Sequence, residues 1–367
     1  LVETIEKNGL TWSLKNTVGM FSFALWDKKD KNLYLAVDRF SEKPLYYSFN
    51  NKELTFSSEL KLFEKLTPYK NLEICNVAKN SFFLLGYIPA PLSIWKDIFK
   101  VKPGTFIKFT QNSNETHVCN YVKDDDSNLD KEYISNLVKN GETKSLVKKT
   151  ISTAIERHLI SDVDCGVFLS GGVDSSLITA LSGEFLDKKL KTFSVGFDLN
   201  KYDESNYANQ VSKHFSTNHH SIEFNKKKFL ENLITLPHVF DEPFGDPSAL
   251  PTMEISKFAS TKVKVILGGD GADEIFGGYS RYFSRKKTYI FQLLKNISFD
   301  FLQRKKDNYF DLNLSSDLSN ILKFFKIFKE SNPFLKSIIL NSYWVNFLTE
   351  DLKKVLLEIF NTDLNSK

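Results

Sequence analysis

A short segment rich in glycine and serine, SGGVDSS at residues 170–176, carries the strongest chemical signal in the chain. It follows an apolar run, GVFL, and precedes a stretch with helical periodicity. A strand, a glycine turn and a helix in this order direct backbone N–H groups and the positive end of a helix dipole at one point. Gly171 and Gly172 lack a Cβ and allow close approach of a ligand, while Ser170 and Ser175 add hydroxyl donors. The pattern predicts a phosphate-binding loop, although not a Walker loop.

Asp174 is the unusual member of this loop, because a carboxylate near phosphates repels them unless a cation lies between. Mg²⁺ is the natural cation, since it binds one or two carboxylates together with phosphate oxygens. An alternative is an ordinary turn in which Ser170 caps a helix and Asp174 occupies its first turn. The complete heptapeptide after an apolar strand favours the nucleotide-binding interpretation.

A second turn rich in glycine and acids lies in VILGGDGADEIFGGYSRY, residues 265–282. In an open parallel sheet, ligands bind outside the carboxyl ends of the strands, so this turn and the first can face one site. Asp270, Asp273 and Glu274 would then bring carboxylates towards the phosphate loop. The alternative is a tight turn before an acidic helix N-terminus, and the presence of the first loop makes it the weaker interpretation.

The elements that must position these turns alternate between helix and strand from Ser145 onward, as in a parallel sheet covered by helices. Strands are expected at 164–169, 191–197, 219–224 and 263–267. Helices are expected at 145–160, 175–186, 206–215, 226–238 and 249–260.

The preceding part of the chain is rich in strand patterns. Hairpins are expected from 19–27 with 32–38 and from 45–48 with 54–57, a helix capped by Ser58 over 59–66, and a last strand at 105–109. Residues 122–144 are polar and weakly periodic, which places a domain boundary there.

Composition excludes several classes of function. The net charge of +4, from 49 basic and 45 acidic residues, is too balanced for a nucleic-acid-binding face. No stretch approaches the length of a membrane span. Three cysteines without C-x-x-C spacing suggest a reducing compartment, hence the cytoplasm. His219 and His220 lack a third ligand at useful spacing, which favours a structural role over a metal site.

These motifs together resemble one family. SGGVDSS is similar to the pyrophosphate loop of the ATP-pyrophosphatase superfamily, and GGDGADEIFGGYSRY resembles the asparagine synthetase signature, with Gly268 where Ser is more usual. HVFDEPFGDPSALPT at 238–252 resembles a further segment of that family. GMFSFALWDKKDKNLYLAVDRFSEKPLYYSF and LTFSSELKLF are similar to the end of a class II glutamine amidotransferase domain.

The resemblance implies an α/β protein with a parallel-sheet, adenine-nucleotide α-hydrolase-like (PP-loop) domain. That domain would follow the C-terminal part of an αββα Ntn-type glutaminase domain. The expected domains are 1–122 for the glutaminase part, 123–144 for a linker and 145–367 for an ATP-binding domain incomplete at its C-terminus.

The resemblance also implies site residues. Those for ATP and pyrophosphate are Leu169, Ser170, Gly171, Gly172, Asp174, Ser175, Val195, Gly268 and Gly269. Asp174 and Asp273 match the carboxylates for Mg²⁺ and pyrophosphate, and Asp270 an acid near the reacting centre. The implied reaction converts aspartate, ATP and glutamine or ammonia to asparagine, AMP and pyrophosphate through β-aspartyl-AMP. A homodimer is compatible with the resemblance, and neither nucleic acid nor membrane is expected as a partner.

The sequence departs from the family at both ends. The family's glutaminase nucleophile is an N-terminal Cys, whereas residue 1 is Leu, and a later segment with a pyrophosphate-binding Lys has no match. The chain is therefore expected to be cut at both ends, without glutaminase activity of its own. Two other functions remain open. One is a related amidotransferase acting on another carboxylate, such as a surface-polysaccharide sugar acid, and the other is a non-catalytic remnant.

Overall fold

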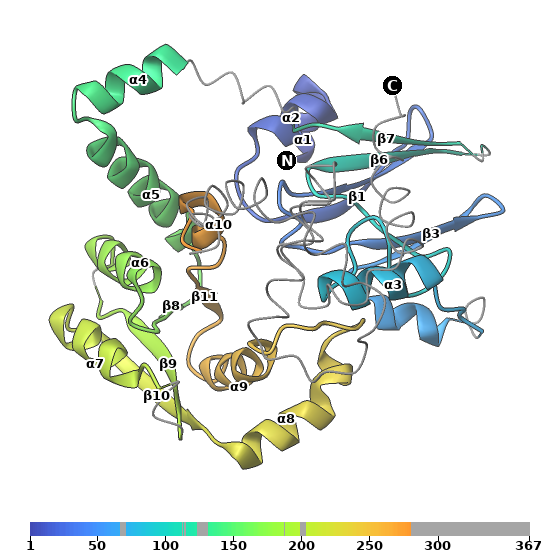
Figure 1. Cartoon of the computed structure of the whole chain (residues 1–367). Helices are drawn as coiled ribbons and strands as arrows, with labels where there is room; N and C mark the ends of the chain where they lie inside the picture. The colour runs from blue at the N-terminus through green and yellow to red at the C-terminus, as the bar shows by residue number, and fades with distance from the viewer. Residues whose placement is uncertain are drawn as a thin grey trace, which may run out of the picture. The chain divides into compact units, whose positions relative to one another are not determined.

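The computed structural model describes residues 1–66, 71–111, 113, 115–122, 131–186, 188–198 and 203–279. Within these residues the chain forms two compact units (Figure 1). The first contains Leu1–Glu142 together with Ile234–Pro247, and the second contains Thr143–Leu233 and resumes at Ser248. None of the helices in this described part is long and apolar enough to cross a membrane.

The first unit contains two antiparallel sheets. One sheet has the order β1-β2-β6-β7, formed by β1 (Ser22–Asp27), β2 (Asn32–Val37), β6 (Thr105–Thr110) and β7 (Thr116–Asn120). The other has the order β4-β3-β5, formed by β3 (Tyr46–Asn50), β4 (Glu53–Ser57) and β5 (Phe99–Lys100). Both predicted hairpins are confirmed, as β1 with β2 and β3 with β4.

The alternation of side chains along β2 explains how these sheets are layered. Leu35 and Val37 are fully buried against Leu45 and other residues that belong to the second sheet or flank it. Ala36 points the other way and packs with helix α2 (Leu10–Asn16), which follows α1 (Val2–Asn8). The far side of the second sheet is covered by helix α3 (Asn76–Leu85) and the 3₁₀ helix η1 (Leu60–Lys65). The order of layers is αββα, as predicted.

Three details of the first half differ from prediction. The helix expected over 59–66 is the short η1, and Ser58 does not cap it; the backbone N–H of Leu60 donates instead to the carboxylate of Asp241. β6 is not the last strand, because β7 pairs with it.

The polar stretch expected to be a linker contains helix α4 (Lys131–Lys139), which precedes α5 (Thr143–Leu159). The apolar side chains Tyr133, Ile134 and Val138 of α4 are 53%, 42% and 63% exposed. The helix therefore buries little of its apolar surface against the described residues.

The second unit contains a four-stranded parallel sheet with the order β10-β9-β8-β11, as the alternating pattern predicted. Its strands are β8 (Cys165–Phe168), β9 (Lys191–Phe197), β10 (Asn218–Phe224) and β11 (Val265–Leu267). Its helices are α6 (Val173–Glu184), α7 (Ser205–His214), α8 (Lys226–Val239), α9 (Ala249–Ala259) and α10 (Ala272–Phe276). The chain adds strands on one side of β8 and then places β11 on the other side, so the strand order reverses between β8 and β11.

The two faces of this sheet pack against different helices (Figure 1). Phe193 of β9 is fully buried and packs with Ile255 and Ala259 of α9. Its neighbour Thr192 points to the opposite face, where its hydroxyl is linked through Thr217 to α7. The carboxyl ends of β8, β9 and β11 are thereby held at one edge, between a helix on each face.

Candidate active site

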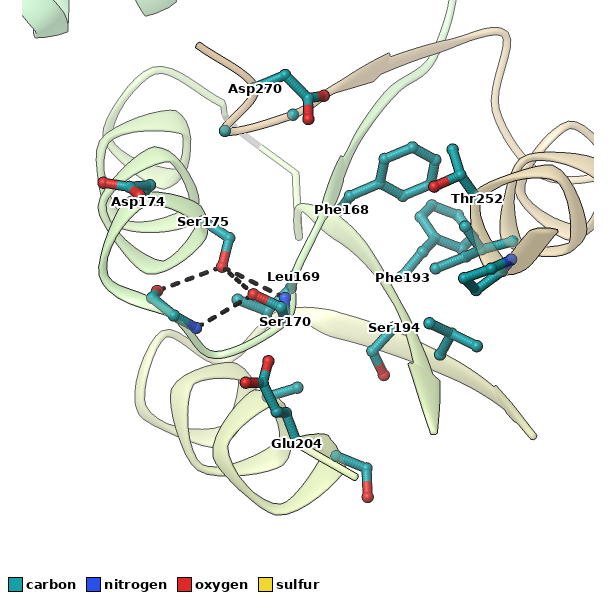
Figure 2. Close-up of a pocket in the computed structure, with 18 of the residues that line it drawn as sticks. Phe168, Leu169, Ser170, Asp174, Ser175, Phe193, Ser194, Glu204, Thr252 and Asp270 are labelled. Atoms are coloured by element: carbon teal, nitrogen blue, oxygen red, sulfur yellow. Dashed lines mark hydrogen bonds between the residues drawn. The ribbon is translucent and has the colours of Figure 1, made fainter. Parts of the chain in front are cut away.

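The loop after β8 is folded by its own serines. Leu169 is buried and its N–H donates to the carbonyl of Phe193, 2.8 Å away, which fixes the end of the strand. The Ser175 hydroxyl donates to the Gly172 carbonyl at 3.3 Å and lies 3.1 Å from the Ser170 hydroxyl. The Ser170 hydroxyl in turn accepts the N–H of Gly172 at 3.2 Å (Figure 2). These bonds hold the backbone of the loop in one conformation.

Gly171 cannot be replaced by a larger residue without strain. Its φ is +87°, and a Cβ built there would lie 2.5 Å from Cβ of Tyr207 and 2.6 Å from the backbone nitrogen of Ala208. α6 begins at Val173, with Gly172 as its N-cap and no side-chain cap. The N–H groups of its first turn are therefore not satisfied by a capping side chain and can bind an anion.

The glycine turn after β11 lies against this loop, as predicted. A Cβ at Gly269 would be 3.2 Å from Cβ of Asp174 and 3.5 Å from the nitrogen of Ser175. The carboxylate of Asp270 folds over Gly268, where a Cβ would be 2.8 Å from Oδ2. Glycines at both positions therefore let the second turn approach the start of α6.

Both turns line one cavity of about 430 Å³ in the second unit (Figure 2). The predicted residues in its lining are Leu169, Ser170, Gly172, Asp174, Ser175, Val195, Gly268, Gly269 and Asp270. Its volume lies within the usual range of ligand pockets, about 300–1,000 Å³. The cavity adjoins the reversal of strand order between β8 and β11, which is where ligands bind in sheets of this kind.

Sequence reasoning missed part of the lining. Glu204 and Ser205 lie at the start of α7, Thr252 lies in the first turn of α9, and Ser194 lies on β9. An apolar part is formed by Phe168, Phe193, Phe197, Ala208, Pro251 and Ile255. Glu204 could have been found from its position after the carboxyl end of a strand. Thr252 could have been found because it ends a segment that resembles the family. Ser194 and the apolar residues read only as core.

Two predicted site residues do not line the cavity. The absence of a side chain at Gly171 allows α7 to approach the loop closely. Asp273 lies in α10, and its carbonyl accepts the N–H of Gly278 at 2.9 Å while its carboxylate lies close to the same glycine. The predicted role of Asp273 as a partner of Asp174 stays a prediction. Tyr279 donates to Glu274 at 2.8 Å.

The carboxylates of Asp174 and Asp270 make no hydrogen bond or ion pair with any residue that the structure describes. Both residues line the cavity, so each carboxylate is available to a ligand there. Nearby acids behave differently: hydrogen bonds from Ser205 lower the pKa of Asp203.

His219 is within 2.9 Å of the Thr192 hydroxyl and 3.1 Å of Ser194, and burial lowers its pKa. His220 stacks on Phe193 with ring centroids 5.4 Å apart.

A glycine turn, an uncapped helix and a strand-order reversal around one cavity are the features expected of a nucleotide-binding domain of the PP-loop type. Comparison with known proteins then identifies the family. Residues 146–328 match the family model of asparagine synthase, and residues 1–121 match that of a glutamine amidotransferase domain. The chain belongs to the asparagine synthetase family, with a glutamine amidotransferase domain before the synthetase domain.

Curated relatives agree with this assignment. A protein of Methanocaldococcus jannaschii named as a glutamine-hydrolysing asparagine synthetase is 38% identical over 72% of this chain and 50% of its own length. Glutamine-hydrolysing asparagine synthetase 1 of Bacillus subtilis is 34% identical over 72% of this chain and 40% of its own. The chain thus spans half or less of the length of these relatives. A solved structure of an NH₃-dependent NAD synthetase from Campylobacter jejuni matches 54% of this chain and 91% of its own chain, at 13% identity and a TM-score of 0.29.

Proposed function

We propose that the protein to which this chain belongs makes asparagine from aspartate, ATP and glutamine or ammonia, with β-aspartyl-AMP as the intermediate. The observation that carries the proposal is the contact of two glycine turns beside one cavity, with Asp174 and Asp270 in its lining. Family membership supports ATP-dependent amide synthesis in general, and aspartate as the acceptor is our inference from the relatives' names.

The first step needs a site for the departing diphosphate. The carboxylate oxygen of aspartate would attack the α-phosphorus, and the bond to the β-phosphate oxygen would break, so that pyrophosphate leaves with the electron pair. The N–H groups of the first turn of α6 suit these oxygens, because no capping side chain accepts from them and Asp174 and Ser175 of that turn line the cavity. Ser170 adds a hydroxyl donor.

The charge of ATP also has to be balanced. Asp174 and Asp270 fit a role in holding Mg²⁺, which when bound would neutralise the phosphates. Asp273 stays a candidate for the same role. The apolar part of the cavity, with Phe168, Phe193 and Ile255, suits a planar base, and the backbone of Val195 is the expected adenine contact.

The second step transfers the amide nitrogen. Ammonia would attack the acyl carbon of the mixed anhydride, the bond from that carbon to the phosphate oxygen would break, and AMP would leave as nitrogen loses a proton. Positioning and charge stabilisation are the expected contributions of the protein to both steps. A cytoplasmic location and a homodimer stay predictions that accompany this proposal.

The test is an ATP–pyrophosphate exchange assay on the product of the complete gene, with and without aspartate. Exchange that requires aspartate, followed by asparagine formation with ammonia, is the expected result. Exchange that requires a sugar acid instead would assign the protein to an amidotransferase for that substrate. The absence of both exchange and ATP binding would mean a non-catalytic role.

A further inference from the structure

The segment from the last part of α8 to the approach to α9 belongs by sequence to one domain and by packing to the other. The match to the asparagine synthase family model spans residues 146–328 without a break. Ile234–Pro247 nevertheless forms part of the first compact unit. We call this segment the arm. The chain leaves the second unit within α8, packs the arm into the first unit, and resumes the second unit at Ser248.

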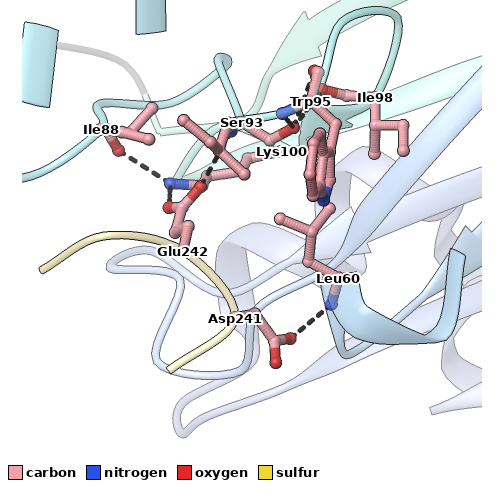
Figure 3. A network of polar contacts seen from close by, with 9 residues as sticks. Leu60, Ile88, Ser93, Trp95, Ile98, Lys100, Asp241 and Glu242 are labelled. Carbon is pink, nitrogen blue, oxygen red and sulfur yellow. Dashed lines mark hydrogen bonds and ion pairs between the residues drawn. The ribbon is translucent and has the colours of Figure 1, made fainter. Parts of the chain in front are cut away.

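Glu242 is the central anchor of the arm. Its carboxylate pairs with the ammonium of Lys100 and accepts the backbone N–H of Ile94 at 3.2 Å (Figure 3). Lys100 also donates to the carbonyl of Ile88 at 2.8 Å. The side chains of Lys100 and Glu242 are only 19% and 15% exposed. Burial raises the pKa of Glu242 although Lys100 opposes it.

Two neighbouring positions strengthen this anchor. Asp241 accepts the N–H of Leu60 at the start of η1 (Figure 3). It also lies 3.6 Å from the ammonium of Lys61. The N–H of Gly245 donates to the carbonyl of Gly86 at 2.7 Å, and a Cβ at Gly245 would be 3.1 Å from that oxygen. The arm is therefore held through two carboxylates and one backbone N–H group.

The arm leads directly into the wall of the cavity. α9 begins at Ala249, only two residues after the end of the arm, and its first turn contributes Pro251 and Thr252 to the cavity lining. The same turn is held inside the second unit, where Asn232 donates to the carbonyl of Leu250 at 3.4 Å. Further along α9, Glu254 pairs with Lys228 at 3.0 Å. The start of α9 is therefore fixed by contacts within its own unit on one side and follows the anchored arm in the chain on the other.

We propose that Glu242 is a positioning residue of the nucleotide cavity. By fixing the arm through Lys100 and Ile94, it sets where α9 begins and so places Pro251 and Thr252 in the cavity wall. This inference rests on the proposed function for the identity of the ligand, ATP. Glu242 itself does not line the cavity, so its effect is expected through the chain and not through contact with the nucleotide.

The test compares Glu242→Gln with Glu73→Gln in the product of the complete gene. Glu73 pairs with Lys96 at 2.9 Å in the same unit, but these side chains are 72% and 58% exposed, so the control removes an equivalent charge at a surface site. We expect Glu242→Gln to raise KM for ATP about tenfold, a usual size for coupling between separate sites. Glu73→Gln is expected to leave KM unchanged.

A second readout reports on the start of α9 directly. The N–H of Thr252 donates to the carbonyl of Ser248 at 3.0 Å, so its hydrogen exchange measures whether the first turn is formed. Glu242→Gln should speed this exchange. Lys100→Met removes the other partner and should give the same change, and the double variant should be no worse than either single one.

The outcomes separate this inference from the proposed function. A wild-type protein that neither binds ATP nor catalyses ATP–pyrophosphate exchange would overturn the proposed function alone. Amide hydrogen exchange at Thr252 would still test the role of the arm. An active wild type in which Glu242→Gln lowers only the melting temperature, with KM for ATP and exchange at Thr252 unchanged, would overturn the positioning role. If Glu242→Gln does not fold, Lys100→Met takes its place, because Glu242 can still accept from Ile94.

Discussion

A structural carboxylate of the first unit and the two cavity carboxylates of the second unit are used in opposite ways. In the first unit, Asp38 is 2% exposed and its oxygens accept four backbone N–H groups, from Phe21, Phe40, Glu42 and Lys43. In the second unit, Asp174 and Asp270 line the cavity and have no hydrogen-bond or ion-pair partner among the described residues. A buried acid with its acceptor sites filled stabilises the fold, whereas an acid left unfilled at a cavity can meet a ligand.

The comparison shows why acids cannot be assigned a role from their type alone. Glu242 resembles Asp38 in being paired and largely buried, although it lies in a segment that matches the synthetase family by sequence. The surroundings of a carboxylate, and not the domain to which its sequence belongs, distinguish a structural acid from a site acid. Identical substitutions at the two kinds of position should therefore have different effects.

Asp174→Asn is expected to have the largest effect. Turnover in aspartate-dependent ATP–pyrophosphate exchange should fall about 10²-fold or more, because a preorganised charge partner of the phosphates is lost. The free energy of unfolding should change by less than about 0.5 kcal/mol, since the carboxylate supports no contact in the described fold. Wild-type exchange in this variant would remove Asp174 from the site.

Gly171→Ala should affect both folding and binding. The positive φ and the approach of Tyr207 and Ala208 leave no room for a methyl group, so we expect a loss of about 2–3 kcal/mol in the free energy of unfolding, together with weaker ATP binding. Urea unfolding measures the first quantity. Gly183→Ala is the control: it lies in α6 with no atom within 4 Å of a Cβ, and should stabilise by about 0.5–1 kcal/mol. Equal stability of the two variants would contradict the close approach at Gly171.

Asp38→Asn makes the same chemical change as Asp174→Asn at the structural position. One amide NH₂ would face backbone N–H donors, which leaves buried donors without an acceptor, so we expect a loss of about 2 kcal/mol in the free energy of unfolding. The affinity of the second unit for ATP should stay at the wild-type value under native conditions. Denaturant unfolding and nucleotide titration on the same samples test both statements, and a wild-type midpoint of unfolding would show that the hydrogen bonds of Asp38 contribute nothing.

Asp164 should give the smallest effect, because it is an exposed structural acid. Hydrogen bonds from Lys188 and Lys191 lower its pKa from 3.8 to about 2. A lowered pKa means that the contribution to stability is present above pH 3.8 and is lost as the pH falls towards about 2. Asp164→Asn should therefore reduce the dependence of stability on pH in that interval only, and added salt should weaken the difference. Parallel pH profiles for the variant and the wild type would count against the pairing.

Local sequence was sufficient for the elements around the site. The loop 170–176 combines glycine, serine and a following helix, and each of these has a local physical reason for its conformation. The hairpins of the first unit were equally clear, because apolar alternation is local. The parallel order could be predicted from the helix–strand alternation, which also placed the two glycine turns at one edge of the sheet.

Non-local packing accounts for what sequence did not give. Ser58 was a reasonable cap by type, but Asp241, 181 residues away from Leu60 in the sequence, takes the N–H at that helix end. The apolar lining of the cavity could not be separated from core, because Phe193 serves both. The arm carries acids and prolines typical of a surface loop, and only its contacts with Lys100 and Gly86 show that it packs into another unit.

The packing of the arm into the first unit affects how the two domains can be expressed as separate fragments. A single cut near residue 143 would leave Asp241 and Glu242 attached to a fragment that contains neither Leu60 nor Lys100. A nucleotide-binding half expressed alone would carry those two acids without their hydrogen-bond and ion-pair partners. An amidotransferase half expressed alone would lose the packing of the arm. Each half should therefore be less stable alone than in the whole chain. Mixing the two halves should restore part of the lost stability, as it does for complementing fragments.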